Sequence, residues 1–451
     1  MARIDTLSNF LTDVADSIRE KTGNTEPISC EDFDTEIESI ESGGANLQTK
    51  SVTIISNGTT SVTPDTNYDG LSSVSITTNV PTGGDTPEKG FVVNEWDTNG
   101  YPKNITLINM EQVPAHYFYA YNATNGIGTK LETTNLGAPN KIGIYAFYNC
   151  ANLKNVVLSN QLSSIDLDAG AFNNCSALQT INLPARITDY NKASVFQGCT
   201  NLILSSMPDT NNITLGNYYF YNCSKITISE LPTAIIYIGI SSFENCSNIT
   251  ISKLNDNTTY VHARAFYNCS KITISNLEVV STTIGANAFY GCSLITPTKL
   301  SDTANVNILA NGTSVFEGCS SITKFDLTTS QYVPTRAFRD CTNLVSVIME
   351  GAKNIYGNTV ANAAFYNCTS LKAAWIGSGI TSANFQRYVF QGCTSLEYIY
   401  IDLPRATVEA FTYYSTKWSN NTVPSTCQVI CNDDNNFITA TEFRNTDWSL
   451  V

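Results

Sequence analysis

The sequence predicts a β-rich repeat solenoid with short N-terminal α-helices and a small β module. Two observations carry this prediction. A Phe-x-x-Cys motif recurs eleven times at a spacing of 22 to 27 residues, and apolar residues recur at fixed distances after each cysteine. A fixed period of about 24 residues is typical of a stacked repeat array. The repeated cysteines are Cys150, Cys175, Cys199, Cys223, Cys246, Cys269, Cys292, Cys319, Cys341, Cys368 and Cys393.

The apolar positions of the repeat predict a shared core. The third residue after each cysteine is Leu or Ile, and the eighth is Leu, Ile or Met, as in Leu153 and Leu158. One coil cannot bury its own apolar side, so neighbouring coils must stack and form one continuous core. The phenylalanines of the motif are Phe147, Phe172, Phe196, Phe220, Phe243, Phe266, Phe289, Phe316, Phe338, Phe365 and Phe390.

Each repeat predicts a turn followed by a strand. The Phe-x-x-Cys spacing favours a helical or 3₁₀ turn that directs both side chains inward. The residues after the cysteine are β-branched, as in the segment 226–229, which favours a short strand. In five central coils the sixth residue after the cysteine is polar, and there we expect the strand to shift register or to face water. These polar residues are Ser205, Ser229, Ser252, Ser275 and Thr298.

The cysteines are predicted to be reduced and buried. Stacked coils would place their side chains in parallel, which is the wrong arrangement for a disulfide. We therefore expect them to act as small hydrophobic residues of the core.

The repeat resembles the BspA-like leucine-rich-repeat family over about residues 100–425. The segments 146–153 (Ala-Phe-Tyr-Asn-Cys-Ala-Asn-Leu) and 171–178 (Ala-Phe-Asn-Asn-Cys-Ser-Ala-Leu) carry the resemblance. It implies a leucine-rich-repeat fold that serves adhesion or interaction and not catalysis.

The ends of the chain differ from the repeat. A short apolar stripe at heptad spacing predicts an N-terminal helix that attaches to a partner or to copies of itself, although packing on its own chain is equally compatible with the pattern. Alternating apolar residues and Asn57-Gly58 predict a small β module with a hairpin. The stripe residues are Ile4, Leu7, Leu11, Val14 and Ile18.

These patterns give five segments. Residues 1–45 are a helical attachment segment, 46–80 the β module and 81–90 a Gly/Pro linker. Residues 91–425 are the solenoid, with an N-terminal cap from 91 to about 140, because repeat arrays need capped ends. Residues 426–451 are the C-terminal cap.

The first hundred residues resemble the N-terminal parts of phage tail-fibre and baseplate-associated virion proteins. The segments 7–23 and 51–60 carry this resemblance. It implies an N-terminus that binds other virion proteins and carries a distal recognition domain. No apolar signal segment opens the sequence, which agrees with a virion protein made in the host cytoplasm.

Composition argues against several classes of function. The formal net charge of −14 disfavours nucleic acid as a partner, and no long apolar run indicates membrane insertion. Only two histidines are present, so we expect neither a histidine-containing catalytic triad nor a metal site built on histidine ligands. We expect no enzyme activity, no metal and no cofactor.

The last two coils and the segment after them predict a ligand surface. Residues five and seven after each cysteine should point away from the core, and here they become aromatic. Gathered aromatic rings favour either a stacking platform for sugars or proteins, or a surface that the C-terminal cap covers. These residues are Trp375, Tyr398, Tyr400, Tyr413, Tyr414 and Trp418.

These observations predict a phage virion structural protein of the tail-fibre or receptor-binding type. Its partners would be other virion proteins and a host cell-surface glycan or protein, and we expect a homo-oligomer. The alternatives are a bacterial surface adhesin with the same repeats and a head decoration fibre.

Overall fold

The computed structural model describes residues 58–62, 74–78, 90–119, 127–256, 258–280, 283–300, 313–357, 359–411 and 423–450. The chain divides into two compact units, Met1–Lys89 and Gly90–Val451. The division falls inside the segment that the sequence predicts to be a linker. The predicted attachment residues lie outside the described residues, and they are Ile4, Leu7, Leu11, Val14 and Ile18.

The described part of the first unit is one antiparallel pair of strands. Strand β1 (Gly58–Val62) pairs with β2 (Val74–Thr78). Gly58, which we predicted in a hairpin turn, instead opens β1 opposite Thr78, so the turn is misplaced.

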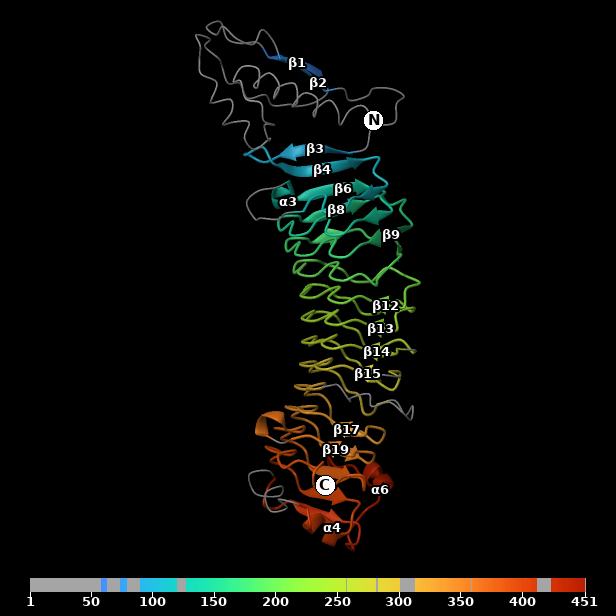
Figure 1. The fold of residues 1–451 in the computed structure, drawn as a ribbon, viewed down its shortest axis with the longest axis vertical. Coiled ribbons are helices and arrows are strands. Elements are labelled where there is room, and N and C mark those ends of the chain that lie inside the picture. The colour runs from blue at the N-terminus through green and yellow to red at the C-terminus, as the bar shows by residue number, and fades with distance from the viewer. Residues whose placement is uncertain are drawn as a thin grey trace, which may run out of the picture. The chain divides into compact units, whose positions relative to one another are not determined.

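The second unit is a solenoid whose coils stack one upon the next (Figure 1). Strands β3 and β4 form an antiparallel hairpin at its first edge, and the strands that follow are parallel. This first sheet has the order β10-β8-β6-β4-β3. Its strands are β3 (Gly90–Trp96), β4 (Pro102–Ile108), β6 (Thr133–Gly137), β8 (Asn155–Leu158) and β10 (Thr180–Ile181).

A second face of the solenoid carries shorter parallel strands. The first group is β5 (Gln112–Val113), β7 (Lys141–Ile142), β9 (Ser164–Leu167) and β11 (Arg186–Ile187). The second is β12 (Thr214–Leu215), β13 (Tyr237–Ile238), β14 (Tyr260–Val261) and β15 (Thr283–Ile284). The third is the pair β17 (Tyr332–Val333) and β19 (Asn354–Ile355).

The final coils form a five-stranded parallel sheet of order β16-β18-β20-β21-β22. Its strands are β16 (Lys324–Asp326), β18 (Ser346–Met349), β20 (Ala373–Ile376), β21 (Tyr398–Ile401) and β22 (Gln428–Cys431). The short helices are α3 (Ile127–Lys130), η1 (Val360–Asn362), α4 (Arg405–Glu409) and α6 (Ala440–Asn445).

The strand predicted after every cysteine is wrong for the central coils. The segment around Ile226-Thr227-Ile228 forms no strand, although the equivalent segments of the outer coils do. In the outer coils the sixth residue after the cysteine points into the core, as Val156 does. In the central coils the fifth residue, such as Ile228, is buried instead and the polar sixth residue, such as Ser229, is exposed. Of the two alternatives predicted for these coils, the polar sixth residue faces water, although no strand forms there.

The core is built on a stack of phenylalanine rings. From Phe118 through Phe390, consecutive rings lie 5.0–5.9 Å apart with interplanar angles of 3–28°. Phe118, which shows only a weak repeat pattern, thus belongs to the first coil. Stacking at this distance adds to the stabilisation that burial of each ring provides.

The cysteines are reduced and buried, and each one also links two coils. The Cys175 thiol donates to the Phe147 carbonyl oxygen of the preceding coil at 2.9 Å, and the same bond recurs in all eleven coils at 2.9–3.1 Å. The prediction of small hydrophobic residues missed this donor role. This hydrogen bond explains why cysteine occupies the position in every coil, although Ala or Val would fill a similar volume.

A left-handed residue precedes every repeated cysteine. Asn245, with φ of 61°, is an example, and only Asn, Asp or Gly occupies this position in the eleven coils. These residues tolerate positive φ better than other types. The backbone around them forms successive turns closed by bonds such as Cys246 N to Phe243 O at 3.0 Å, and not a continuous helix.

Candidate functional site

The aromatic residues predicted to bind a ligand point away from the main core but are covered. Trp375 and Tyr400 belong to a second apolar cluster on the outer face of the last sheet. The C-terminal segment supplies the other half of that cluster with Ala440, Phe443 and Trp448. Only 3% of Trp375 and 6% of Tyr400 is exposed, so neither forms part of an open platform.

Specific contacts hold this cover in place. The Trp375 Nε1–H donates to the Ile438 carbonyl oxygen at 3.1 Å, and the Tyr400 ring lies 6.0 Å from both Phe443 and Trp448. Burial raises the pKa of the Tyr400 hydroxyl. Tyr398 is half-buried and contacts the Trp448 ring at 5.9 Å.

Of the two alternatives predicted for these residues, Trp375 and Tyr400 form a surface that the C-terminal cap covers, because helix α6 packs on it. Thr439 and Glu442 form a capping box that starts α6, and Arg444 pairs with Asp326 and Glu350 on the sheet. The remaining predicted residues lie outside the described residues, and they are Tyr413, Tyr414 and Trp418.

A surface that the sequence analysis missed lies along the turns of the solenoid. The positions two residues before and one residue after each repeat phenylalanine form two adjacent columns, which we call the turn ladder. Tyrosine, arginine or histidine occupies at least one of these positions in eight of the twelve coils, and the coils of Phe172, Phe196, Phe243 and Phe316 have none of them. These residues are His116, Tyr119, Tyr145, Tyr148, Tyr218, Tyr221, Arg264, Tyr267, Tyr290, Arg336, Arg339, Tyr366 and Tyr388.

Contacts within the turn ladder run both along and across the coils. Tyr267 and Tyr290 stack at 4.5 Å with an interplanar angle of 9°, and Tyr119 and Tyr148 stack in the same way at 4.9 Å. Across one coil, the Arg264 guanidinium lies 4.1 Å from the centre of the Tyr267 ring. Such contacts keep large side chains ordered while they remain partly open to solvent.

Two buried carboxylates hold arginines of the turn ladder in position. Glu244, which is 2% exposed, accepts from the Arg264 Nε–H at 2.8 Å and also pairs with Arg264 Nη2. Glu317 lies 3.5 Å from Arg339 in the same way. The hydrogen bond that Arg264 donates to Glu244 raises the pKa of Arg264.

The described residues offer little for catalysis or metal binding. They contain no group of three or more His, Cys, Asp and Glu side chains arranged to hold a metal ion. Burial lowers the pKa of His262, which stacks on Tyr260 at 5.4 Å, and no acidic partner is recorded for this histidine among the described residues. Within the described ranges, no helix is long and apolar enough to cross a membrane.

A stack of coils around one continuous apolar core defines a repeat protein of the solenoid class. The model of the BspA type leucine-rich repeat region matches residues 127–214, 213–345 and 310–437, and the chain belongs to this family. Repeat proteins of this family typically work through interaction or adhesion and not through catalysis. A comparison with curated proteins gives no significant match.

Several solved structures are similar to this chain at low identity. A leucine-rich repeat protein from Bacteroides ovatus is 20% identical, covers 76% of this chain and 98% of its own, and has a TM-score of 0.42. A leucine-rich cell surface protein from Faecalibacterium prausnitzii is 16% identical over 74% of this chain and 98% of its own, with a TM-score of 0.36. A leucine-rich repeat protein from Eubacterium ventriosum is 20% identical over 65% and 85%, with a TM-score of 0.40.

Proposed function

We propose that this protein recognises a cell-surface glycan or protein through the turn ladder. The observation that carries the proposal is the recurrence of tyrosine, arginine or histidine at two fixed positions in eight of the twelve coils that contain a stacked phenylalanine. Tyr and Arg are the residues most enriched where binding energy concentrates in interfaces. Their preordered rings and guanidinium groups lose little conformational freedom on binding.

The repetition suits an extended partner. Adjacent coils present equivalent rings about one strand spacing apart, so several weak contacts add along one ligand. A polymer chain or an elongated protein segment would engage more coils than a compact ligand does.

We further propose that a phage virion carries this recognition surface, attached through residues 1–45. The proposal rests on the N-terminal resemblance to tail-fibre and baseplate-associated proteins, on the heptad stripe and on the linker at 81–90. A bacterial surface adhesin is the second candidate, because the repeat array suits either setting. An antibody against this chain, applied to purified virions and to cell-envelope fractions, separates the two settings.

A binding experiment tests the turn ladder. Fluorescently labelled protein is applied to a panel of Gram-positive bacterial cells and binding is measured by flow cytometry. The double variant Tyr218→Ala/Tyr221→Ala should bind about tenfold more weakly than wild type, because truncation of hot-spot residues commonly costs 2 kcal/mol or more. The matched control is Thr227→Ala/Thr250→Ala, which changes exposed residues of this coil and the next one, away from the ladder. Equal binding by both variants would contradict the proposal.

A further inference from the structure

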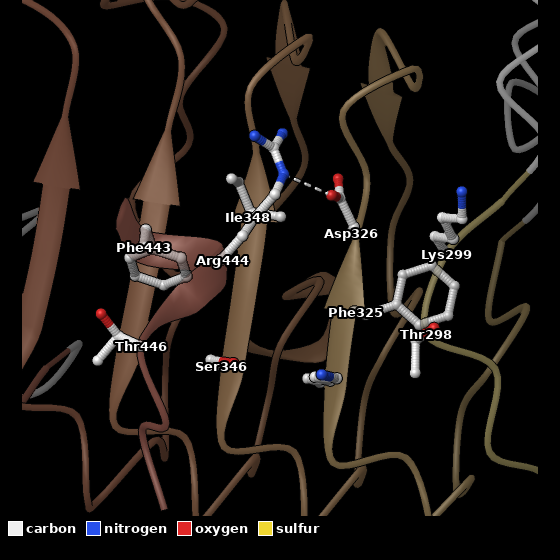
Figure 2. A pocket seen from close by; sticks show the side chains of 10 residues that line it. Thr298, Lys299, Phe325, Asp326, Ser346, Ile348, Phe443, Arg444 and Thr446 are labelled. Atoms are coloured by element: carbon white, nitrogen blue, oxygen red, sulfur yellow. Dashed lines mark hydrogen bonds and ion pairs between the residues drawn. The ribbon is translucent and has the colours of Figure 1, made fainter. Parts of the chain in front are cut away.

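A cavity of about 210 Å³ opens on the outer face of the last sheet. Strands β16 and β18 form its floor with Asp326, Ser346 and Ile348, and one side wall is the coil segment 298–299. Figure 2 shows Phe443 and Arg444 of helix α6 beside the strands that carry Ile348 and Asp326. The cavity thus exists because the C-terminal segment folds back over the sheet.

The cavity is cationic within an acidic protein. Three of its lining residues are basic, Lys299, Lys324 and Arg444, and Asp326 is the one acidic lining residue. The whole chain has a formal net charge of −14, so this grouping runs against the overall charge. A recess whose lining carries an excess of one sign of charge attracts ligands of the opposite sign.

Two of these cations have fixed partners, and the third does not. Arg444 pairs with both Asp326 and Glu350, and Lys299 Nζ lies 2.7 Å from Glu278 Oε2, so carboxylates balance the charges of these two cations. Lys324 is exposed, and no ion pair involves it among the described residues. Hydrogen bonds from Ser449 lower the pKa of Asp447, and the charge of Lys324 lowers it further without a direct contact between the two side chains. This ammonium is therefore available to an incoming anion.

The rest of the lining suits a sugar. Thr298, Ser346 and Thr446 bring hydroxyl groups, which donate to and accept from the hydroxyl groups of a sugar. Phe443 and Ile348 also line the cavity, but each is only 3% exposed, so the contacts with a ligand come from the polar groups.

We propose that this cavity binds a saccharide unit that carries an anionic group, with Lys324 as the residue that pairs with the anion. A carboxylate of an acidic sugar and a phosphate of a polyol phosphate share this chemistry. The site is separate from the turn ladder and would give the protein a second, charge-selective contact with a surface polymer.

Titration calorimetry with three probes tests the proposal on the full-length protein. The probes are oligogalacturonate for the carboxylate, oligo(glycerol phosphate) for the phosphate and a neutral galactose oligomer of equal length. Wild type should bind at least one anionic probe more tightly than the neutral one, and the probe that binds identifies the anion. Lys324→Glu should weaken that binding by about tenfold or more, because a hydrogen bond to a charged group contributes roughly 1.5–3 kcal/mol.

The control makes the same charge change elsewhere. Lys253→Glu alters an exposed lysine of the central coils and should leave the affinity unchanged, with both variants checked for an unaltered melting temperature. Equal loss in the two variants would mean a nonspecific charge effect and would overturn the proposal. Equal affinity of wild type for neutral and anionic probes would overturn it as well. Neither result bears on cell binding by the turn-ladder variants.

Discussion

The Cys246 thiol lies 3.0 Å from the Phe220 carbonyl oxygen of the preceding coil, and the same oxygen accepts from the Cys223 backbone N–H at 3.0 Å. Both lone pairs of a buried carbonyl are thus used, one within its coil and one by the next coil. The thiol is therefore a connector between coils as well as a small apolar group.

This double role predicts a particular order of stability for two variants of Cys246. Cys246→Ala removes the donor and leaves a small cavity, and it should cost about 1–2 kcal/mol. Cys246→Ser keeps a donor of similar size and should cost less. Denaturant unfolding gives both values. If the serine variant is the less stable one, the thiol acts only as a hydrophobic residue.

The left-handed backbone at Asn245 predicts a different effect for alanine and glycine. Asn245→Ala should destabilise the protein by about 1–2 kcal/mol, because a Cβ without a local polar partner is strained at positive φ. Its side chain also donates to Asn222 Oδ1 at 2.8 Å and accepts from Asn268 at 3.0 Å, and alanine loses both bonds. Asn245→Gly loses the same bonds without the strain and should be the milder change. Equal melting temperatures for the two variants would contradict this reasoning.

The buried thiols predict slow chemical modification and instability at alkaline pH. Burial raises the pKa of Cys246 well above its ordinary value, and it raises the pKa of Cys427 to about 12. The thiolate is the reactive form, so a thiol reagent at pH 8 should label the ladder cysteines only after denaturation.

The pH dependence follows from the same shift. In the unfolded chain a cysteine ionises at about pH 8.5, whereas the folded thiol keeps its proton. The stabilisation is complete below about pH 8.5 and is lost as the pH rises from there toward the folded pKa, at up to about 1.4 kcal/mol per thiol and pH unit. Urea unfolding between pH 7 and 10 measures this loss, and constant stability over that range would exclude the effect.

The covered aromatic face predicts a structural role for Trp375. Trp375→Ala should cost about 3–5 kcal/mol through a cavity beneath α6, whereas Trp375→Phe should cost less because it keeps most of the apolar volume. Cell binding by the folded fraction should stay at the wild-type level, because the ring is not accessible. Lost binding with an unchanged melting temperature would restore Trp375 as a ligand contact.

The sequence allowed the coil to be predicted because its determinants are local. The Phe-x-x-Cys spacing and the residues three and eight after the cysteine define the inner surface, and Leu153 and Leu158 are buried as expected. The strands of the central coils were predicted wrongly because β-branched residues such as Ile226-Thr227-Ile228 favour a strand by propensity alone. In the structure Ile226 and Ile228 both point into the core without forming a strand, and β propensity does not distinguish these two outcomes.

The candidate site was less predictable, because it depends on contacts between distant segments. Arg444 reaches Asp326 across 118 residues, and no local pattern indicates that α6 folds back over Trp375. The turn ladder did leave a signal. Tyr267 and Tyr290 each follow a repeat phenylalanine directly, and a comparison of all columns of the repeat would have found them.

The bond between each cysteine and the previous phenylalanine gives the array a direction. A coil such as residues 247–269 brings one new acceptor at Phe266 and one new donor at Cys269. When a whole coil is inserted or removed, every cysteine thiol still finds a phenylalanine carbonyl oxygen in the preceding coil. The new junction therefore needs no compensating substitutions. Unequal recombination between copies of this repeat can lengthen or shorten the protein in a single event. The length of the solenoid can therefore evolve without changes to the residues of its core.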